Sequence, residues 1–301
     1  MSRQGTIKRY TLIIERINRG LYPTLKEIET YLFDHGFEIS KRTLQRNIEQ
    51  IRDEFGIEII YDQEKKGYFI DKESSIQFNS FLRFLEIANT AELITESIKD
   101  SKKTLEYISF DNDGTLKGIS NLKILLQAIK EQKVVTFTHY NFDQGNYKER
   151  KLYPYLLKEY LNRWYVIGLQ EKDNTNFRTF GIDRISNITL TTEVFVRNQE
   201  LHPQSLFSSI IGVIYPEENI QEVVLKFTPF QGKYIKTLPL HHSQEILIDN
   251  DKELTIRLWI KINYELKQRL LMLIDQVEVL KPIALRDEMK QVLTKTLNNY
   301  N

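Results

Sequence analysis

The sequence contains no cysteine, and this absence removes a whole range of chemistry. Without thiols, its 301 residues can form no disulfide, no thiolate nucleophile and no cysteine-ligated zinc or iron–sulfur site. It also lacks an apolar run of about eighteen or more residues, so no transmembrane helix and no membrane partner are expected. The first residues, Met1 to Gly5, lack the apolar stretch of a signal peptide. These absences favour a cytoplasmic protein.

The short motifs of common enzyme classes are missing as well. The sequence has no Gly-x-Ser-x-Gly, no Walker loop, no Gly-x-Gly-x-x-Gly and no His-Glu-x-x-His. Its single pair of adjacent histidines, His241 and His242, would point apart on an extended chain, which disfavours a metal site. We therefore expect no enzyme, no catalytic residue, no metal and no cofactor.

The chain also has almost no net charge, because 42 Lys and Arg stand against 41 Asp and Glu. The largest basic excess lies in the middle: residues 119–198 carry twelve Lys and Arg against eight Asp and Glu, a net charge of +4. Any nucleic-acid binding by the first residues must therefore depend on where their charges point. The length predicts two or three domains.

Residues 1–71 are predicted to form three helices followed by a β-hairpin. Thr24 and Glu27 have the spacing of a capping box at the start of the second helix. Ser40 is the expected N-cap of the third helix, and Gly56 ends it. The apolar stripe of this third helix is Leu44, Ile48, Ile51 and Phe55.

This order of elements is typical of a winged helix-turn-helix, whose third helix enters the DNA major groove by its N-terminal half. Arginine and glutamine pair with base edges, and a basic wing can contact phosphates. The alternative is a helical bundle whose charged face is only solvated. The predicted DNA-binding residues are Lys41, Arg42, Thr43, Gln45 and Arg46 of the helix and Lys65, Lys66 and Tyr68 of the wing.

Residues 72–132 are predicted to be a helical linker. Helices are expected over 76–107 and 119–133, with a turn at Asp111–Gly114 that lacks the downstream glutamate of a calcium loop. The first helix carries more apolar residues than an exposed helix should. It is therefore expected to pack on a neighbouring domain or on a second copy of the chain.

Residues 133–198 have the pattern of short antiparallel strands joined by turns. Strands are expected over 134–140, over 150–157 with an interruption at Pro154, over 163–169 and over 177–185. Such strands favour a small barrel or a curled sheet. Trp164 and Tyr165 are expected to lie in its core.

One stretch of this region resembles a known family. The sequence from Arg163 to Gly168, with Arg150 and Pro154 before it and Arg178-x-Phe180-x-x-Asp183-Arg184-Ile185 after it, is similar to the WYL domain. Val166 stands where that family has the leucine of its name. A winged helix-turn-helix, a helical linker, a WYL domain and a C-terminal WCX region make up the layout of WYL-domain transcriptional regulators, which nearly the whole chain resembles.

The resemblance implies a small Sm-like, SH3-type β-barrel that senses a nucleic acid or a nucleotide, and it implies a homodimer. The ligand-binding residues that it implies are His139, Tyr140, Arg150, Arg178 and Arg184. Arg178 and Arg184 would lie about 20 Å apart on a straight strand. They can share one small ligand only if the strand bends sharply; otherwise they mark a track for a polymer such as single-stranded DNA.

Residues 199–219 are expected to be a connector, and 220–301 have the order βαββαβα of a ferredoxin-like α/β sandwich. This part resembles the WCX region, although Trp259 is followed by Ile260 where that region has a cysteine.

The sequence thus predicts a multidomain α+β protein with boundaries at 1–71, 72–132, 133–198, 199–219 and 220–301. Its predicted function is that of a ligand-responsive, dimeric regulator of transcription that binds double-stranded operator DNA, with repression favoured over activation. The alternative is a nucleic-acid-binding adaptor that is not a transcription factor.

Overall fold

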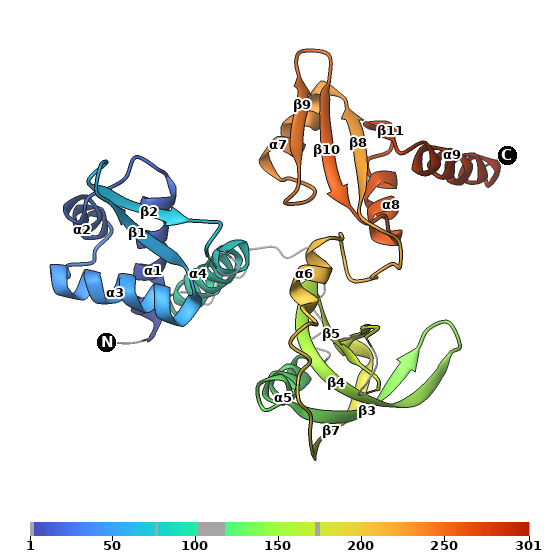
Figure 1. Cartoon of the computed structure of the whole chain (residues 1–301), viewed down its shortest axis with the longest axis horizontal. Coiled ribbons are helices and arrows are strands. Elements are labelled where there is room, and N and C mark those ends of the chain that lie inside the picture. The colour runs from blue at the N-terminus through green and yellow to red at the C-terminus, as the bar shows by residue number, and fades with distance from the viewer. Residues whose placement is uncertain (1–2, 76–77, 101–117, 172–174, 301) are drawn as a thin grey trace. The chain divides into compact units, whose positions relative to one another are not determined.

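The structure is a computed structural model that describes residues 3–75, 78–100, 118–171 and 175–300. The chain divides into two compact units, Met1–Asp113 and Gly114–Asn301, and each is described by itself (Figure 1). The predicted turn at Asp111–Gly114 and the ends of the predicted helix 76–107 lie outside the described residues.

The first unit consists of helices and one hairpin. Its elements are α1 (Arg3–Asn18), α2 (Leu25–Asp34), α3 (Lys41–Phe55), β1 (Glu58–Asp62), β2 (Gly67–Asp71) and α4 (Phe78–Asp100). The capping box predicted for α2 is confirmed: the Thr24 hydroxyl accepts the Glu27 amide, and Glu27 Oε2 accepts the Thr24 amide at 2.7 Å. Ser40 Oγ accepts the amide of Thr43 at the start of α3, as predicted.

The core of this unit lies between the helices and the hairpin. Leu44, Ile48 and Ile51 of the predicted α3 stripe are buried in it, and Phe55 packs against its edge. Helix α4 adds Phe78, Phe81 and Leu85 to the same core. It leaves Phe84 44% and Ile87 50% exposed, so α4 covers its own unit with one face and presents apolar side chains on another.

The second unit begins with a helix and a five-stranded antiparallel sheet. Its elements are α5 (Ile119–Lys130), β3 (Lys133–Asn141), β4 (Asn146–Tyr160), β5 (Arg163–Leu169), β6 (Arg178–Gly181), a 3-10 turn (Ile182–Arg184) and β7 (Ile185–Val194). The strand order is β6-β5-β4-β3-β7. The edge strands β6 and β7 are not paired with each other in the described residues, so a closed barrel is not confirmed.

Strand β4 is longer than predicted, because it continues through Pro154. The proline stands opposite Gly168, and the register shifts between Pro154 and Leu156. A bulge of this kind tolerates a residue that has no amide hydrogen to donate. The expected interruption is therefore a bulge within one strand.

The predicted strand over 177–185 is wrong in its second half. The chain leaves β6 after Gly181, makes the 3-10 turn and enters β7, a strand that the sequence analysis did not find. Ile182 and Ile185 are three residues apart and would face opposite sides of a strand. The turn instead buries both in the cluster that contains Phe180.

The expectation that Trp164 lies in the core is also wrong, because its side chain is 39% exposed. Trp164 pairs with Glu159 next to the turn of the β4–β5 hairpin. Burial begins later in β5, where Val166 and Ile167 are both fully buried. Tyr165, between these two regions, is half-buried.

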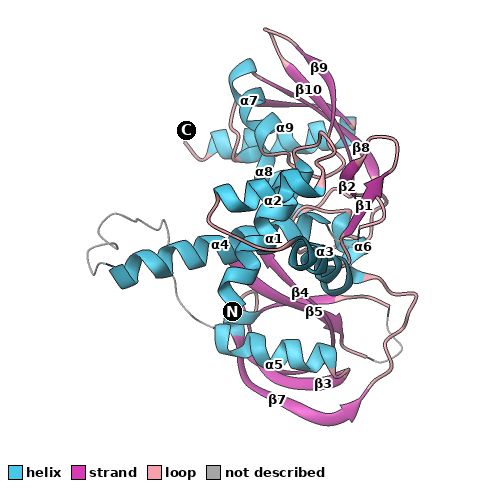
Figure 2. Ribbon diagram, turned by 90° about the vertical axis from the view of Figure 1, so that its left-hand side faces the viewer, coloured by secondary structure: helices cyan, strands magenta, loops and turns pink. Residues whose placement is uncertain are grey.

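The C-terminal part of the second unit has the predicted order βαββαβα. After α6 (Pro203–Ser208) come β8 (Gln221–Phe227), α7 (Pro229–Thr237), β9 (Glu245–Asp249), β10 (Leu254–Ile260), α8 (Tyr264–Leu271), β11 (Val277–Lys281) and α9 (Ile283–Asn298). The antiparallel sheet has the strand order β11-β8-β10-β9. The helices α7, α8 and α9 lie on one side of it (Figure 2), and their buried residues join those of β8 and β10 in one cluster.

Candidate ligand-binding site

A cavity of about 560 Å³ lies in the second unit, between the five-stranded sheet and the C-terminal part. Its walls come from the β4–β5 turn, from β5 and β6, from the chain after α6 and from the start of α8. Its charged and amide-bearing lining residues are Arg163, Arg178, Arg184, Glu265 and Gln268. Its aromatic lining residues are Tyr160, Tyr165, Phe177, Tyr215 and Tyr264.

The 3-10 turn brings two predicted ligand-binding residues to this cavity. Arg178 begins β6, and Arg184 ends the turn that follows the same strand. Because the chain turns after Gly181, both side chains line one cavity. Arg163, which the sequence analysis did not propose as a ligand-binding residue, joins them from the start of β5. The structure therefore gathers three guanidinium groups where a straight strand would have separated two.

Asp183 and Gly181 fix the position of this cluster. Asp183 forms an ion pair with Arg163, with 3.6 Å between the charged atoms. A β-carbon at Gly181 would lie 2.7 Å from Asp183 Oδ1 and 3.1 Å from Arg184 Nε. The two side chains therefore pack directly over the glycine, and a larger residue would push them out of place. Arg184 also lies over the ring of Phe142, 4.6 Å from its centre.

His139 and Arg150 do not line the cavity, but His139 lies close enough to Arg184 and to Arg150 to interact with their charges. His139 is buried with its ring edge against Phe180, and its Nε2 has no hydrogen-bond partner in the described structure. Burial lowers the pKa of His139, and the nearby charges of Arg184 and Arg150 lower it further. Arg150 Nε is likewise buried without a partner among the described residues.

Tyr140, the fifth predicted residue, lies apart from the cavity. Its ring contacts Phe142 at 5.7 Å and Tyr147 at 4.8 Å between ring centres. Since Phe142 also carries Arg184 on its face, Tyr140 supports the arginine cluster only through that ring. Of the five predicted residues, Arg178 and Arg184 line the cavity, whereas His139, Tyr140 and Arg150 do not.

The C-terminal part contributes a buried acid that the sequence analysis missed. Glu265, near the start of α8, is 5% exposed. Its Oε1 accepts the amides of Val213 and Ile214 at 3.0 and 2.9 Å. The carbonyl of Val213 in turn accepts the hydroxyl of Thr179 from β6 at 3.1 Å. An acid in the first turn of a helix is ordinarily explained by the helix dipole, so no local signal marked it.

Burial also shifts the pKa values of ionisable side chains near Glu265. It raises the pKa of Tyr160 and of Tyr165, and the charge of Glu265 adds to this effect, so both hydroxyls keep their protons. Burial lowers the pKa of Lys158, whose Cα is paired with that of Tyr165 across β4 and β5. The cavity thus combines arginine cations, protonated phenols and one carboxylate.

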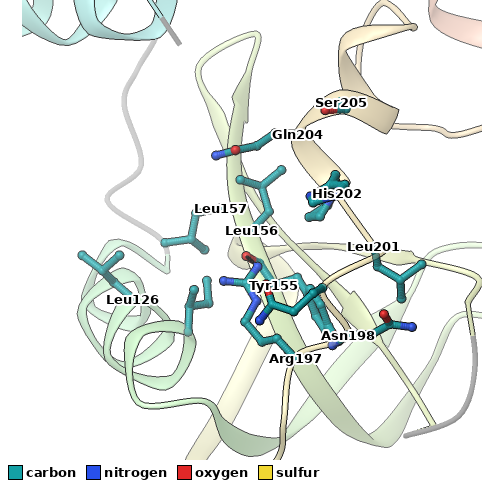
Figure 3. A pocket seen from close by; sticks show the side chains of 13 residues that line it. Leu126, Tyr155, Leu156, Leu157, Arg197, Asn198, Leu201, His202, Gln204 and Ser205 are labelled. Carbon is teal, nitrogen blue, oxygen red and sulfur yellow. Dashed lines mark hydrogen bonds between the residues drawn. The ribbon is translucent and has the colours of Figure 1, made fainter. Parts of the chain in front are cut away.

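A second cavity, of about 580 Å³, lies beside α5 (Figure 3). Its one arginine, Arg197, donates to the carbonyl of Tyr155 at 3.0 Å and lies over the same ring, 4.7 Å from its centre. The amide of Asn198 donates to the Tyr155 hydroxyl at 3.2 Å. No predicted site residue lines this cavity, and its cation already serves the fold. The arginine-lined cavity is therefore the better candidate.

The predicted DNA-binding residues lie on the first unit. Lys41, Arg42, Gln45 and Arg46 of α3 are exposed, as are Lys65 and Lys66 in the turn between β1 and β2. Thr43 is half-buried, and its hydroxyl lies 3.0 Å from Ser40 Oγ in the helix cap. Tyr68 is half-buried with its ring against Tyr61. Lys65 Nζ lies 3.9 Å from the centre of the Tyr22 ring.

The described residues contain neither a cluster of metal-binding side chains nor a helix suited to cross a membrane. No group of three or more His, Asp and Glu side chains in the described ranges is placed to hold a metal ion. None of the described helices is both long enough and apolar enough to cross a membrane.

Comparisons with known proteins support the two domain resemblances. The WYL domain model matches residues 120–190, and the WCX domain model matches residues 219–297. The WYL match begins within α5 and includes β3 to β6, and the WCX match spans β8 to α9. The chain therefore contains a WYL domain and a WCX domain, both in the second unit.

Similar solved structures include the proteasome accessory factor B/C (PafBC) of Arthrobacter aurescens, at 15% identity and a TM-score of 0.29, with 96% of this chain and 46% of that chain covered. The chain thus spans about half the length of that protein. Another is a CRISPR Cas-related protein, at 11% identity and a TM-score of 0.39, with 99% and 85% covered. Both TM-scores are too low to assign a shared fold. No curated protein matches the sequence.

Proposed function

We propose that this protein is a DNA-binding regulator of transcription that responds to an anionic ligand of nucleotide or nucleic-acid type. The observation that carries the proposal is the gathering of Arg163, Arg178 and Arg184 on one cavity. The WYL and WCX domain matches support a role in regulation. The first unit supplies the DNA-binding part of the proposal.

The chemistry of the cavity favours a planar, phosphorylated ligand. Guanidinium groups bind phosphate through paired hydrogen bonds, and tyrosine rings offer faces on which a base can stack. A volume of about 560 Å³ is in the range of small-molecule pockets. The cavity therefore suits a single nucleotide, or the end of a strand, better than a long track of phosphates.

The first unit supports DNA binding through its order of elements and its exposed cations. Three helices followed by a hairpin are the parts of a winged helix-turn-helix. In this proposal Arg42, Gln45 and Arg46 contact base edges, while Lys65 and Lys66 contact phosphates. Lys41 lies at the start of α3, where the helix dipole also favours phosphate. Thr43 and Tyr68, both half-buried, have supporting roles.

The proposed active form is a homodimer that reads two half-sites. The exposed Phe84 and Ile87 of α4 support a partner surface on the first unit. A ligand that binds one arrangement of the dimer more tightly shifts the population towards it, and with it the spacing of the two α3 helices. Repression is the proposed outcome, and sedimentation at several protein concentrations tests the dimer.

Arg46→Ala tests the DNA-reading part. Genome-wide binding mapping first identifies a bound sequence, and gel-shift titrations then compare the variants on it. Loss of a bidentate arginine is expected to weaken specific binding by about 1–3 kcal/mol. Lys295→Ala removes one exposed charge from α9 and is the matched control. Equal affinity of the Arg46 variant and the wild type would reject Arg46 as a base-reading residue.

Genome-wide mapping also separates the proposed regulator from an adaptor. Discrete sites near promoters support the regulator. Binding spread along nucleic acid without promoter preference would replace it by a nucleic-acid-binding adaptor.

Arg178→Ala tests the ligand-binding part. The probes are AMP and a short labelled oligothymidylate, measured by calorimetry and by fluorescence anisotropy. The variant is expected to lose binding of the probe while it keeps its affinity for DNA, because Arg178 lies in the second unit. Lys130→Ala removes an exposed charge from the end of α5 and serves as the control. If Arg178→Ala lost both activities and also melted at a lower temperature, Arg178 would be a structural residue.

A further inference from the structure

Glu265 is the one acid among the cavity's lining residues, and its position is enforced by the fold. It follows the N-cap Asn263 by two residues, and Gly212 packs against its side chain. A β-carbon at Gly212 would lie 2.6 Å from the Cγ of Glu265. The carboxylate therefore cannot turn away from the chain after α6, and it stays at the cavity wall.

The two oxygens of this carboxylate have different surroundings. Oε1 accepts two backbone amides, which accounts fully for a structural role. Oε2 is buried and accepts no hydrogen bond from any described residue. A buried carboxylate oxygen without a donor is unfavourable, and natural sites retain such an atom where a ligand or a water supplies the donor. The structural role of Glu265 thus explains only half of the group.

The neighbouring side chains do not supply that donor. Lys158 is close enough for its charge to interact with Glu265, but the two form no ion pair within 4.0 Å among the described residues. Tyr160 and Tyr165 also lie within the reach of its charge, and neither donates a hydrogen bond to it in the described structure. What remains to supply a donor is a group that enters the cavity.

We infer that Glu265 selects the ligand at its uncharged end, by accepting at Oε2 a hydrogen bond from an N–H group, while the arginines hold the anionic end. This inference rests on the proposed function and adds the kind of ligand. The ligand is a nucleoside monophosphate whose base carries an exocyclic amino group. The base lies among the tyrosine rings, and its amino group donates a hydrogen bond to Oε2 of the Glu265 carboxylate.

Both ends of the cavity contribute to this selectivity. A carboxylate repels a second phosphate, because both groups are negatively charged. It also disfavours a carbonyl oxygen placed against it, because two acceptors have no hydrogen to share. A site with a buried acceptor rejects an analogue that lacks the donor strongly, since the acceptor then stays unsatisfied. The cavity is therefore expected to distinguish nucleotides by one amino group, although its arginines bind all of them.

The experiment compares two nucleotides that differ only in that group. AMP and purine riboside 5′-monophosphate, which lacks the amino group, are titrated by calorimetry into the full chain. The wild type is expected to bind AMP at least about tenfold more tightly, the ratio that one hydrogen bond to a charged acceptor provides. Glu265→Gln keeps an oxygen for the amides of Val213 and Ile214 but presents an NH2 group in place of Oε2. Its ratio is expected to fall to about one.

The controls separate this inference from the proposed function. Glu245→Gln changes an exposed acid that is paired with Arg257, and it must keep the preference of the wild type. Equal binding of the two nucleotides by the wild type would overturn the role of Glu265 and leave the anion site intact. This comparison needs no variant, so it stands even if Glu265→Gln fails to fold. Preference for AMP retained in a folded Glu265→Gln would place the donor contact elsewhere.

If neither the wild type nor Arg178→Ala bound either nucleotide, both the proposed anion site and this inference would be rejected. A structure with AMP that shows only a water at Oε2 would also overturn the inference.

Discussion

Replacing Glu265 in two different ways separates its structural role from its electrostatic cost. Glu265→Ala removes the acceptor of two backbone amides, whereas Glu265→Gln keeps an oxygen in the same place and removes only the charge. The amide of Val213 is buried when it donates to Glu265, while that of Ile214 is partly exposed. Water can therefore replace the acceptor for Ile214 but not for Val213.

These contacts give the magnitudes. A hydrogen bond to a charged group contributes about 1.5–3 kcal/mol, so the two bonds together contribute about 3–5 kcal/mol, the partly exposed one being the weaker. Removal of the buried oxygen that lacks a donor stabilises the folded state by about 1–3 kcal/mol, because its desolvation cost disappears. Glu265→Ala is thus expected to lower the free energy of unfolding by about 2 kcal/mol, the difference between the midpoints of these two ranges. Glu265→Gln is expected to stay within about 1 kcal/mol of the wild type, because its weaker hydrogen bonds are offset by the lost burial cost of a charge.

The assay is thermal unfolding followed by calorimetry at neutral pH without ligand. For a unit of this size, about 1 kcal/mol corresponds to about 2–4 °C, so the two variants are expected to melt about 4–8 °C apart. Glu245→Ala, which breaks an exposed ion pair with Arg257, should shift the transition by less than Glu265→Ala does. Equal melting temperatures for Glu265→Ala and Glu265→Gln would refute the reasoning, because the amide acceptor would then contribute nothing.

Three further predictions concern other parts of the chain. Burial lowers the pKa of His139 and of His241 below the ordinary value of 6.5, so the unfolded chain binds protons that the folded chain does not. Stability should therefore fall as the pH drops below about 6.5, and urea titrations of His139→Phe should show a shallower fall. Thr179→Val removes the hydrogen bond to Val213 and should lower the free energy of unfolding by about 1 kcal/mol in the same titrations. Gly67→Ala would place a β-carbon 1.7 Å from a backbone carbonyl oxygen, so it should lower the free energy of unfolding of the first unit by at least about 1–3 kcal/mol. Calorimetry measures this as a lower melting temperature. An unchanged melting temperature would show that the hairpin can shift without a loss of stability.

The elements that the sequence predicted correctly are those with local signals. Ser40 caps α3, and the apolar spacing from Leu44 to Ile51 places one face of that helix in the core. The order βαββαβα followed from alternation, helical spacing and turn residues, none of which requires knowledge of distant contacts. A domain match then confirmed the WYL resemblance, which depended on residues around Trp164 and Arg178.

The features that the sequence did not predict depend on tertiary contacts. The segment after Gly181 alternates well enough to resemble a strand, and only the shared burial of Ile182 and Ile185 shows that the chain turns. Trp164 is exposed because burial in β5 begins only at Val166, two residues further along the strand. Glu265 belongs to the cavity only because the segment after α6 returns to α8, across about fifty residues of sequence.

The peptide group that joins Val213 to Ile214 is held at both ends: its amide, that of Ile214, donates to Glu265 of α8, and its carbonyl, that of Val213, accepts from Thr179 of β6. A peptide group is planar and rigid, so no rotatable backbone bond lies between the hydrogen bond to β6 and the hydrogen bond to α8. A separation of β6 from α8 beyond the range of these contacts must break one of the two hydrogen bonds. While both hydrogen bonds hold, a displacement of β6 next to Arg178 is therefore coupled to α8 through this one peptide group.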